Sequence, residues 1–274
     1  MVNPTLQPGC YYGRILKNCE VGDFILTESL YEPDTKIAQH SHSQSYFCIV
    51  LQGGYRETYD RRVRDCKPST VVFHPPGEVH EDHFCETGGR LFRLEMKQLW
   101  LERARQRGSE LDGATDFAGS TIGWLSSRLY KEFYQMDPLS PMVIEGLSLE
   151  MVGEAGRMSI KLRTRRPPRW LERAKEFLHD TFHEDSSLGK IANLTGIHPV
   201  HFARVFRQFY GCSVGEYIRR LRIDYASRQL STTDTSLAEI GAAAGFSDQS
   251  HFSKSFKLIT GMTPAQYRII FRSR

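Results

Sequence analysis

Residues Ser236 to Tyr267 read SLAEIGAAAGFSDQSHFSKSFKLITGMTPAQY. They repeat the pattern of Ser187 to Tyr217, SLGKIANLTGIHPVHFARVFRQFYGCSVGEY, with one residue inserted. The shared positions are Leu188, Ile191, Gly196, Phe202, Phe206, Gly211 and Tyr217 in the first copy, and Leu237, Ile240, Gly245, Phe252, Phe256, Gly261 and Tyr267 in the second. Each copy is typical of a short helix, a glycine turn and a longer helix, which together form a helix-turn-helix motif. Two such motifs on one chain are suited to entering two successive major grooves of DNA.

The longer helix of each copy is predicted from apolar residues at helical spacing, which face the core of the domain. These residues are Phe202, Val205, Phe206 and Phe209 in the first copy and Phe252, Phe256 and Ile259 in the second. The shorter helix of the first copy is predicted to place Leu188, Ile191, Ala192 and Leu194 on one face. Gly196 takes a positive φ at low cost and predicts the end of that helix. Ser247 or Asp248 is expected to cap the longer helix of the second copy.

Polar side chains between these apolar positions have the chemistry needed to contact DNA. Arg and Lys side chains suit guanine, Gln suits adenine, and Ser suits either base. Arg207 and Lys257 follow the second Phe of each copy and are expected to contact phosphate. For a single helix, an ordinary solvated face would be the simpler interpretation. A duplicated motif with basic residues at matching places favours DNA binding instead.

The segments from Gly245 to Lys257 and from Gly261 to Arg268 resemble the signature of the AraC/XylS family of bacterial transcription regulators. The resemblance covers about Trp170 to Phe271, and it implies that the third and sixth helices of the domain are recognition helices. The base-reading residues that it implies are Val200, Ala203 and Arg204 in the first copy and Gln249, Ser250 and Lys254 in the second. Because Val200 and Ala203 are apolar, the first recognition helix is expected to read thymine methyl groups or to act mainly through Arg204.

Charge is unevenly distributed along the 274 residues, a length that suits two domains. From residue 160 to the end there are 19 Lys and Arg against 10 Asp and Glu, a net charge of +9. The preceding residues have 17 against 22, a net charge of −5, so the overall +4 conceals the asymmetry. A basic part joined to an acidic part is typical of a DNA-binding module attached to a module that does not bind DNA.

The sequence contains no run of about 20 apolar residues that would predict a transmembrane helix. Residues 1–10 lack the basic and apolar regions of a signal peptide. The cysteines form no CxxC pair and are expected to be reduced thiols: Cys10, Cys19, Cys48, Cys66, Cys85 and Cys212. We therefore expect a cytoplasmic protein with no membrane partner.

Between residues 22 and 95 the pattern changes to short β-branched and aromatic runs, which predict strands. These runs are Phe24–Leu26, Tyr46–Leu51, Tyr55–Tyr59, Thr70–Phe73 and Leu91–Leu94. The pair Gly53-Gly54 predicts a hairpin turn. Many closely spaced short strands indicate a small antiparallel barrel or sandwich, so the whole chain is predicted to be an α+β protein of two domains.

Two motifs in this segment, His40-Ser-His42 and Pro75-Pro-Gly-Glu-Val-His80, resemble the HxH and PxGxxH motifs of the cupin barrel. In metal-binding cupins, these histidines bind a divalent ion together with a glutamate. The resemblance therefore implies a divalent metal at His40, His42 and His80 as one possibility. The glutamate position falls near Tyr46, and no carboxylate is there.

Three interpretations of these histidines remain open. Tyr46 and Cys48 share one face of their strand by two-residue alternation. An effector pocket without metal would then be lined by His40, His42, Tyr46, Cys48 and His80, and no cofactor is expected in that case. Alternatively, three imidazoles could hold zinc with water in the fourth position. In the third interpretation the histidines are purely structural.

Three helices are predicted in the middle of the chain, at Leu94–Arg107, Phe117–Gln135 and Pro141–Met158. Leu125, Leu129, Phe133, Val143, Leu147 and Met151 mark apolar faces at a spacing of four residues. Part of these faces must cover the barrel. The family resemblance implies that part packs against a second chain in a homodimer, and packing within one chain is the alternative.

The predicted domains are a cupin-like barrel over residues 1–95, a helical segment for dimerisation or packing over 96–160, a linker over 161–169 and a DNA-binding domain over 170–274. The linker is basic and its Pro167-Pro168 pair interrupts helix. A long helix starting near Val214 is predicted to connect the two helix-turn-helix motifs and to fix the angle between them.

The sequence thus predicts a transcription factor that binds promoter DNA, responds to a small-molecule effector and is not an enzyme. The resemblance implies activation and RNA polymerase as a partner. Two alternatives stay open, a metal-dependent cupin enzyme with an accessory DNA domain and a constitutive regulator whose barrel is only structural. The missing glutamate argues against the first.

Overall fold

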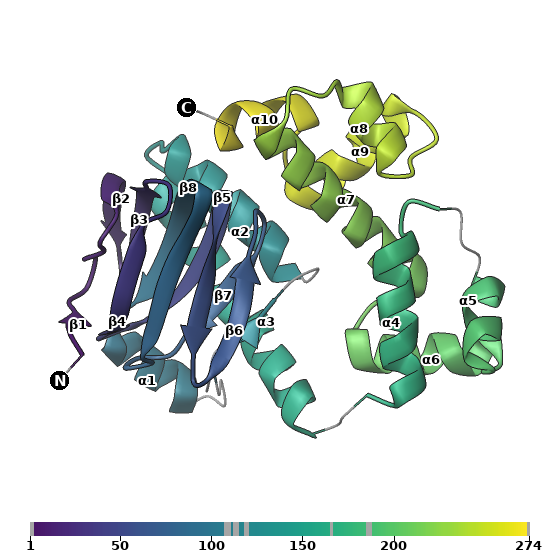
Figure 1. The fold of residues 1–274 in the computed structure, drawn as a ribbon, viewed down its shortest axis with the longest axis horizontal. Coiled ribbons are helices and arrows are strands. Elements are labelled where there is room, and N and C mark those ends of the chain that lie inside the picture. Colours follow the sequence, from purple (N-terminus) through teal and green to yellow (C-terminus); the bar gives the residue numbers. More distant parts are fainter. Residues whose placement is uncertain are drawn as a thin grey trace. The chain divides into compact units, whose positions relative to one another are not determined.

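The computed structural model describes residues 3–106, 111, 115–117, 121–164, 167–184 and 188–272 (Figure 1). Contacts divide the chain into two units, Met1–Ser159 with Ile270–Arg274, and Ile160–Ile269. The first unit contains the strands and the second is helical. Among the described helices, none combines the length and the apolar character that crossing a bilayer requires.

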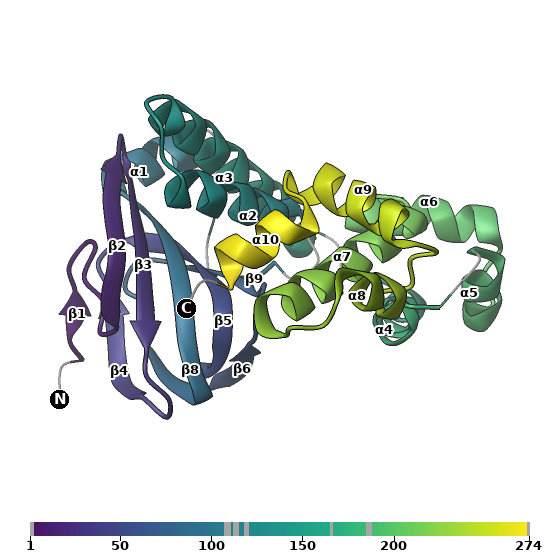
Figure 2. The ribbon, with the colours of Figure 1, turned by 90° about the horizontal axis from the view of Figure 1, so that it is seen from above.

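The first unit is built on two long antiparallel strands, β5 (Ser45–Tyr59) and β8 (His80–Met96). The remaining strands are β1 (Thr5–Leu6), β2 (Arg14–Val21), β3 (Phe24–Tyr31), β4 (Lys36–His42), β6 (Arg62–Cys66), β7 (Val71–His74) and β9 (Thr115–Asp116). Strand β8 pairs with β4 near its start and with β3 near its end, while β5 pairs with β7 and β6 in the same way. Figure 2 shows that the resulting sheet is strongly curled, as expected for the predicted cupin-like barrel.

The glycine pair in β5 makes a bend inside one strand, so the predicted hairpin turn at Gly53-Gly54 is wrong. A Cβ atom on Gly53 would lie 2.0 Å from the Gly88 carbonyl oxygen, and one on Gly88 would lie 2.4 Å from the Tyr31 oxygen. The pairing of β5 with β8 shifts register on both sides of Gly53. The glycines therefore let two bent backbones cross closely. The hairpin turn lies further on, at Asp60 and Arg61, where φ is 43° and 60°.

Three helices follow the sheet in sequence: α1 (Gln98–Gln106), α2 (Thr121–Tyr134) and α3 (Ser140–Thr164). The predicted start of α1 at Leu94 is wrong because β8 continues to Met96. The predicted start of α2 at Phe117 is also early, since Phe117 directly follows β9 outside any helix and α2 begins at Thr121. Helices α2 and α3 cover the sheet (Figure 2) and bury apolar residues that include Leu125, Leu129, Phe133, Leu147 and Met151. Val143 is 38% exposed and does not belong to the buried face.

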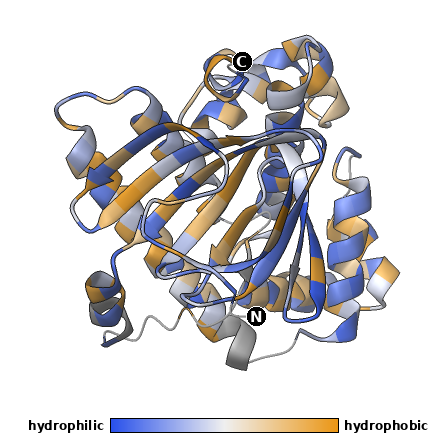
Figure 3. Ribbon diagram, turned by 60° about the vertical axis from the view of Figure 1, so that its left-hand side comes forward, coloured by the Kyte–Doolittle hydropathy of each residue, from blue (hydrophilic) through white to orange (hydrophobic). Residues whose placement is uncertain are grey.

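The interior of the first unit is unusually polar. Figure 3 shows hydrophilic residues interspersed among apolar ones along the strands. Several charged side chains are almost completely buried, namely Glu28, Glu57, Asp82, Arg90, Arg93 and Glu95. Arg90 donates to the Glu28 carboxylate and to the Tyr130 hydroxyl. Buried charges of this kind are stable only when they are paired or hydrogen-bonded, so the barrel is held together by polar contacts as well as by its core.

The second unit consists of helices throughout its described part. They are α4 (Arg169–Thr181), α5 (Leu188–Thr195), α6 (Pro199–Tyr210), α7 (Val214–Thr232), α8 (Leu237–Ala243), α9 (Gln249–Thr260) and α10 (Pro264–Phe271), the last two residues of which are assigned to the first unit. Helix α3 extends to Thr164, so the first residues of the expected linker are helical, and α4 begins at Arg169. Pairs α5–α6 and α8–α9 are the two predicted helix-turn-helix motifs, and α7 is the predicted connecting helix (Figure 1).

Local signals determine where these helices begin and end. The turn glycines Gly196 and Gly245 have φ values of 67° and 84°, which glycine adopts without strain. Asp248 caps α9 by accepting a hydrogen bond from the His251 backbone N–H. The aromatic rings Phe202, Phe206, Phe252 and Phe256 are fully buried. Leu194, predicted to face the core, is instead 56% exposed because it lies in the last turn of α5.

Candidate DNA interface and barrel interior

Helix α6 exposes the residues that sequence reasoning assigned to the first recognition helix. Val200 is 71% exposed, Arg204 and Arg207 are exposed, and Ala203 is half-buried. The Arg204 guanidinium lies 3.2 Å from Nδ1 of His201, an exposed neighbour that the sequence interpretation did not assign. Side chains three and four residues apart lie on the same face of a helix. Val200, Ala203, Arg204 and Arg207 therefore form one continuous strip.

Helix α9 presents the matching strip on the second motif. Gln249, Ser250, Lys254 and Lys257 are all exposed. Ser250, Lys254 and Lys257 follow one another at intervals of four and three residues and share a face, with Gln249 next to Ser250 at the start of the helix. His251 is exposed beside them, with Nδ1 3.2 Å from the Ser247 hydroxyl. The backbone hydrogen bond from His251 lowers the pKa of Asp248, which keeps the cap of this helix ionised.

A single arginine of the connecting helix is bonded both to the end of α4 and to the turn of the second motif. Arg222 of α7 donates to the backbone oxygens of Phe182 at 2.8 Å, Glu184 at 3.0 Å and Gly245 at 2.5 Å. Phe182 caps the end of α4, and Gly245 is the turn glycine of the second motif. The guanidinium offers five donors in a rigid plane. Arg222 therefore fixes the turn before α9 against the helix that leads from the first motif.

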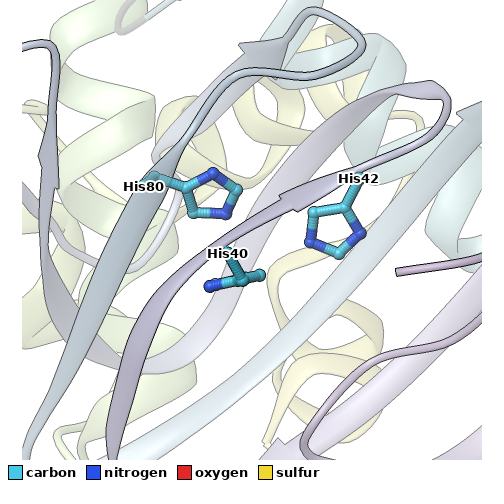
Figure 4. Close-up of side chains that lie close together, drawn as sticks. All are labelled: His40, His42 and His80. Carbon is cyan, nitrogen blue, oxygen red and sulfur yellow. The ribbon is translucent and has the colours of Figure 1, made fainter. Parts of the chain in front are cut away.

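In the first unit, His40 and His42 of β4 meet His80 of β8 (Figure 4). The ring centroids of His40 and His80 lie 4.3 Å apart, and those of His42 and His80 lie 5.5 Å apart. All three side chains are buried. His40 and His42 point to the same side because they are two residues apart on a strand. The structure thus brings together the three histidines that the two cupin-like motifs indicated.

Tyr46 and Cys48 of β5, also assigned to this cluster, are buried in the same interior. The Tyr46 hydroxyl lies 3.3 Å from Nε2 of His80. Cys48 lies farther along β5, where its thiol accepts a hydrogen bond from Tyr55. Burial raises the pKa of the Cys48 thiol, so it is held as an uncharged group.

In His40 and His80, the hydrogen bonds of Nδ1 leave Nε2 as the acceptor nitrogen of the ring. His40 uses Nδ1 to donate to the Ala38 oxygen, and His80 uses Nδ1 to donate to the Glu78 oxygen. Burial is the main cause that lowers the pKa of His40, of His42 and of His80, the last to about 2. Neutral imidazoles with a free Nε2 are good ligands for transition metals. One nitrogen of each of His40, His42 and His80 lies within 4.8 Å of the others, so these residues form the donor group that the metal interpretation requires, and that interpretation stays a prediction.

Sequence reasoning missed two residues of this interior, Glu57 and His74. His74 stacks on Tyr46 with ring centroids 4.5 Å apart, and its Nε2 lies 3.5 Å from Glu57 Oε1. Desolvation raises the pKa of Glu57 to about 7. The register of β5 against β7 places Tyr46 opposite His74. His74 immediately precedes the proline-rich motif in the sequence. Its position opposite Tyr46 in the sheet is the signal that could have identified it.

The barrel interior and a neighbouring cavity differ greatly in size. The interior between the histidines has a free volume of about 10 Å³, enough for roughly one water molecule. Beside it, a cavity of about 300 Å³ is lined by residues that include His42, Ser43, Gln44, Ser45, Gln98 and Glu102. Ser43 Oγ, Gln44 Oε1 and Ser45 Oγ are buried and have no hydrogen-bond partner among the residues that the structure describes. His42 contributes to both spaces.

Two family models match the chain. A helix-turn-helix domain matches residues 191–269, and an AraC-like ligand binding domain matches residues 25–133. The probable transcription factor PqrA of Proteus vulgaris is 38% identical over 85 residues, which are 31% of this chain and 70% of that protein. The HTH-type transcriptional activator AarP of Providencia stuartii is 41% identical over 83 residues, and the match covers 30% of this chain but only 62% of AarP.

Among solved structures, the regulator ToxT from Vibrio cholerae aligns with 91% of this chain and 99% of its own, with 10% identity and a TM-score of 0.40. An AraC-type transcriptional regulator from Chromobacterium violaceum aligns with 37% of this chain and 91% of its own, with 29% identity and a TM-score of 0.36. The matched residues of the family models contain both recognition helices and the histidine-lined sheet. The chain therefore belongs to the AraC family of transcriptional regulators and joins a DNA-binding domain of two helix-turn-helix motifs to an AraC-like ligand-binding domain.

Proposed function

We propose that the protein activates transcription in a bacterial cytoplasm and that a small molecule bound by its first unit controls this activity. The observation that supports DNA recognition most strongly is the pair of matching exposed strips on α6 and α9. Activation is proposed from the similarity to AarP, a transcriptional activator. RNA polymerase is then the second macromolecular partner, since an activator must act on it.

On promoter DNA, the residues of the two strips make two kinds of contact, some to base edges and others to phosphate. Arg204, Gln249 and Lys254 reach base edges, where arginine selects guanine and glutamine selects adenine. Val200 and Ala203 offer apolar contacts to thymine methyl groups, and Ser250 accepts either base. Arg207 and Lys257 contact phosphate, so they supply affinity that falls steeply as salt rises.

The effector is proposed to occupy the cavity of about 300 Å³ between the β4–β5 turn and α1. The interior among the histidines has no room for an organic molecule, whereas this cavity has the volume of a small ligand site. The unpartnered oxygens of Ser43, Gln44 and Ser45 require hydrogen bonds from an occupant. A small polar molecule with several hydroxyl or amide groups supplies them. His42 lines both this cavity and the barrel interior, so a ligand in the cavity would contact the same histidine that packs with His40, Tyr46, Cys48 and His80.

A homodimer is proposed from the exposed apolar side chains of the helices that cover the sheet. Leu139 is 67% exposed, Met142 is 75% exposed and Leu149 is 48% exposed, near or on α3. Exposed apolar residues in such a row are typical of a surface that packs against another chain. Sedimentation analysis tests this proposal: the Met142→Glu variant is expected to be monomeric at concentrations where the unmodified protein is dimeric.

The test of the whole proposal is genomic footprinting followed by binding assays on the promoter fragments that are recovered. We expect preference for these fragments over random duplex at low salt, and a change in affinity when the correct inducer is added. Gln44→Leu is the matched variant, because it removes an amide that lines the cavity and leaves the DNA-binding residues unchanged; it is expected to keep the sequence preference and lose the response to inducer. Absence of any sequence preference, with and without candidate inducers, would exclude the proposal.

The two alternatives predict different results. A metal-dependent enzyme needs space for its substrate beside the metal, and the free volume of about 10 Å³ disfavours it. AdaA of Bacillus subtilis, a bifunctional activator and DNA repair enzyme, shows that a relative can combine the two activities. For a constitutive regulator, alanine at His40 and His42 would leave promoter output unchanged. The present proposal expects the response to inducer to be lost.

A further inference from the structure

A second cluster of metal-binding side chains lies beside the three histidines of the cupin-like motifs. It consists of Glu57 on β5, His74 on β7 and His80 on β8, and one donor atom of each lies within 4.8 Å of the others. All three side chains are buried. The two clusters share only His80. The second cluster includes the carboxylate that the first one lacks.

The hydrogen bonds around His74 leave two acceptors facing each other. His74 donates from Nδ1 to the Glu78 carboxylate at 2.9 Å, so its Nε2 carries a lone pair. That nitrogen faces Glu57 Oε1 at 3.5 Å. Within the described part of the chain, Glu57 Oε1 is buried and has no hydrogen-bond partner, while the other oxygen of Glu57 accepts from Arg64. Two buried lone pairs that face each other need a cation or a proton between them.

The distance favours a metal ion over a proton. A hydrogen bond between a carboxyl group and an imidazole would bring the two atoms to about 2.7 Å, well inside the observed 3.5 Å. Two ligands bound at about 2.05 Å to one tetrahedral ion lie about 3.4 Å apart. The separation of Nε2 and Oε1 therefore matches the edge of a metal coordination tetrahedron.

His80, the third ligand, is oriented by a hydrogen bond from its Nδ1 to Glu78, as His74 is. His80 donates from Nδ1 to the Glu78 backbone oxygen, which leaves Nε2 for the ion. The Tyr46 hydroxyl lies 3.3 Å from that Nε2, at the edge of the cluster. Glu78 thus orients both histidines, one through its side chain and one through its backbone. Such outer contacts fix the tautomer and the direction of a ligand.

We propose that Glu57, His74 and His80 bind one divalent first-row transition-metal ion. Two imidazoles and one carboxylate form a donor set that suits zinc or ferrous iron. A dehydrated ion fits the free volume of about 10 Å³, in which an organic effector does not fit. The site is separate from the cavity beside His42, so it does not depend on the proposed effector.

The experiment uses the full-length protein, stripped with a chelator and then titrated with Zn²⁺ while bound metal is measured by elemental analysis. One ion per chain is expected. Glu57→Gln and His74→Asn are each expected to weaken Zn²⁺ binding at least about 100-fold, and Glu78→Gln, which removes only an outer contact, about 10-fold or more. His40→Asn is the matched control within the other cluster, and it is expected to bind Zn²⁺ as the unmodified protein does.

Co²⁺ absorption provides a readout that does not depend on a variant that folds poorly. The unmodified protein loaded with Co²⁺ should show the intense visible bands of a four-coordinate site, and these should change in Glu78→Gln. Failure of the unmodified protein to bind either ion overturns the proposal. So does loss of binding in His40→Asn with retention in His74→Asn, which would assign the ion to the three histidines. DNA-binding assays are separate, so failure here leaves the proposed function intact.

Discussion

The two units of this protein place their polar groups in opposite locations. In the first unit, charged and imidazole side chains such as Glu57, His74 and Arg93 are buried inside a curled sheet. In the second unit, the interior is formed by aromatic rings and the basic side chains are on the surface of α6 and α9. The difference teaches that a ligand-binding unit recognises its partner from within, whereas a DNA-binding unit recognises its partner from outside.

The largest effect is expected from removing one ring of the aromatic interior. Phe206→Ala should destabilise the second unit by up to about 5 kcal/mol, because Phe206 is fully buried and contacts Phe202, Tyr210 and Tyr217. Urea denaturation followed by circular dichroism measures this change. The neighbouring exposed residue provides the control, since Arg207→Ala should leave the midpoint unchanged. A shift under about 1 kcal/mol for Phe206→Ala would show that the aromatic interior is not tightly packed.

A slightly smaller effect is expected from breaking a buried ion pair of the first unit. Glu28→Gln should destabilise that unit by about 3–4 kcal/mol, because the Arg90 guanidinium loses its carboxylate partner. The double variant Glu28→Leu with Arg90→Met should recover most of the loss, because neither charge is then buried. If the double variant is the less stable one in urea denaturation, the pair contributes net stability and the contrast between the units becomes stronger.

The connecting arginine should affect both the stability and the DNA affinity of the second unit. Arg222→Ala removes hydrogen bonds to three backbone oxygens and should destabilise that unit by about 2–3 kcal/mol. Because the turn before α9 loses its anchor, affinity for a promoter with both half-sites should fall more than affinity for one half-site. Gel-shift assays on the two DNA lengths check this. Exposed Arg219 on the same helix is the control position.

The surface strips should contribute to specificity without contributing to stability. Arg204→Ala and Gln249→Ala should each cost about 1–3 kcal/mol at a cognate site and relax the preference for one base. Lys257→Ala should weaken binding to all sequences alike and reduce its salt dependence. Equal losses on random and cognate duplexes for Arg204→Ala would show that this side chain contacts phosphate only.

The smallest effect is expected from a histidine in the second unit. His179 is hydrogen-bonded to the Tyr217 hydroxyl at 2.9 Å, and burial lowers its pKa below the usual 6.5. A lowered folded-state pKa means that the unfolded chain binds a proton first. Stability is therefore complete above pH 6.5 and declines as pH falls below it. Thermal melts between pH 7.5 and about 5 should show a decline that His179→Gln reduces.

Sequence reasoning worked best for the second unit, where helical spacing and turn glycines act locally. Phe202 and Phe252 lie in the interior, and Gly196 and Gly245 make the turns, because each depends on neighbours a few residues away. In the first unit it identified the sheet and brought His40, His42 and His80 together. It missed Glu57 and His74, because their meeting depends on the pairing of strands far apart in the sequence. It also interpreted Gly53-Gly54 as a turn, since a glycine pair alone does not distinguish a turn from a bend.

The bend at Gly53 has a mechanical consequence for the cluster around His74. Strand β5 carries Tyr46 before the bend and Glu57 after it, and both side chains touch the same imidazole. Strand β5 thus contacts His74 through a residue on each side of its bend, Tyr46 before Gly53 and Glu57 after it. A change in the backbone angles at Gly53 would change the distance between Glu57 Oε1 and His74 Nε2, and therefore the binding of an ion between them. On the proposed metal site, the bend at Gly53 would thereby relate the curvature of β5 to the affinity for the ion.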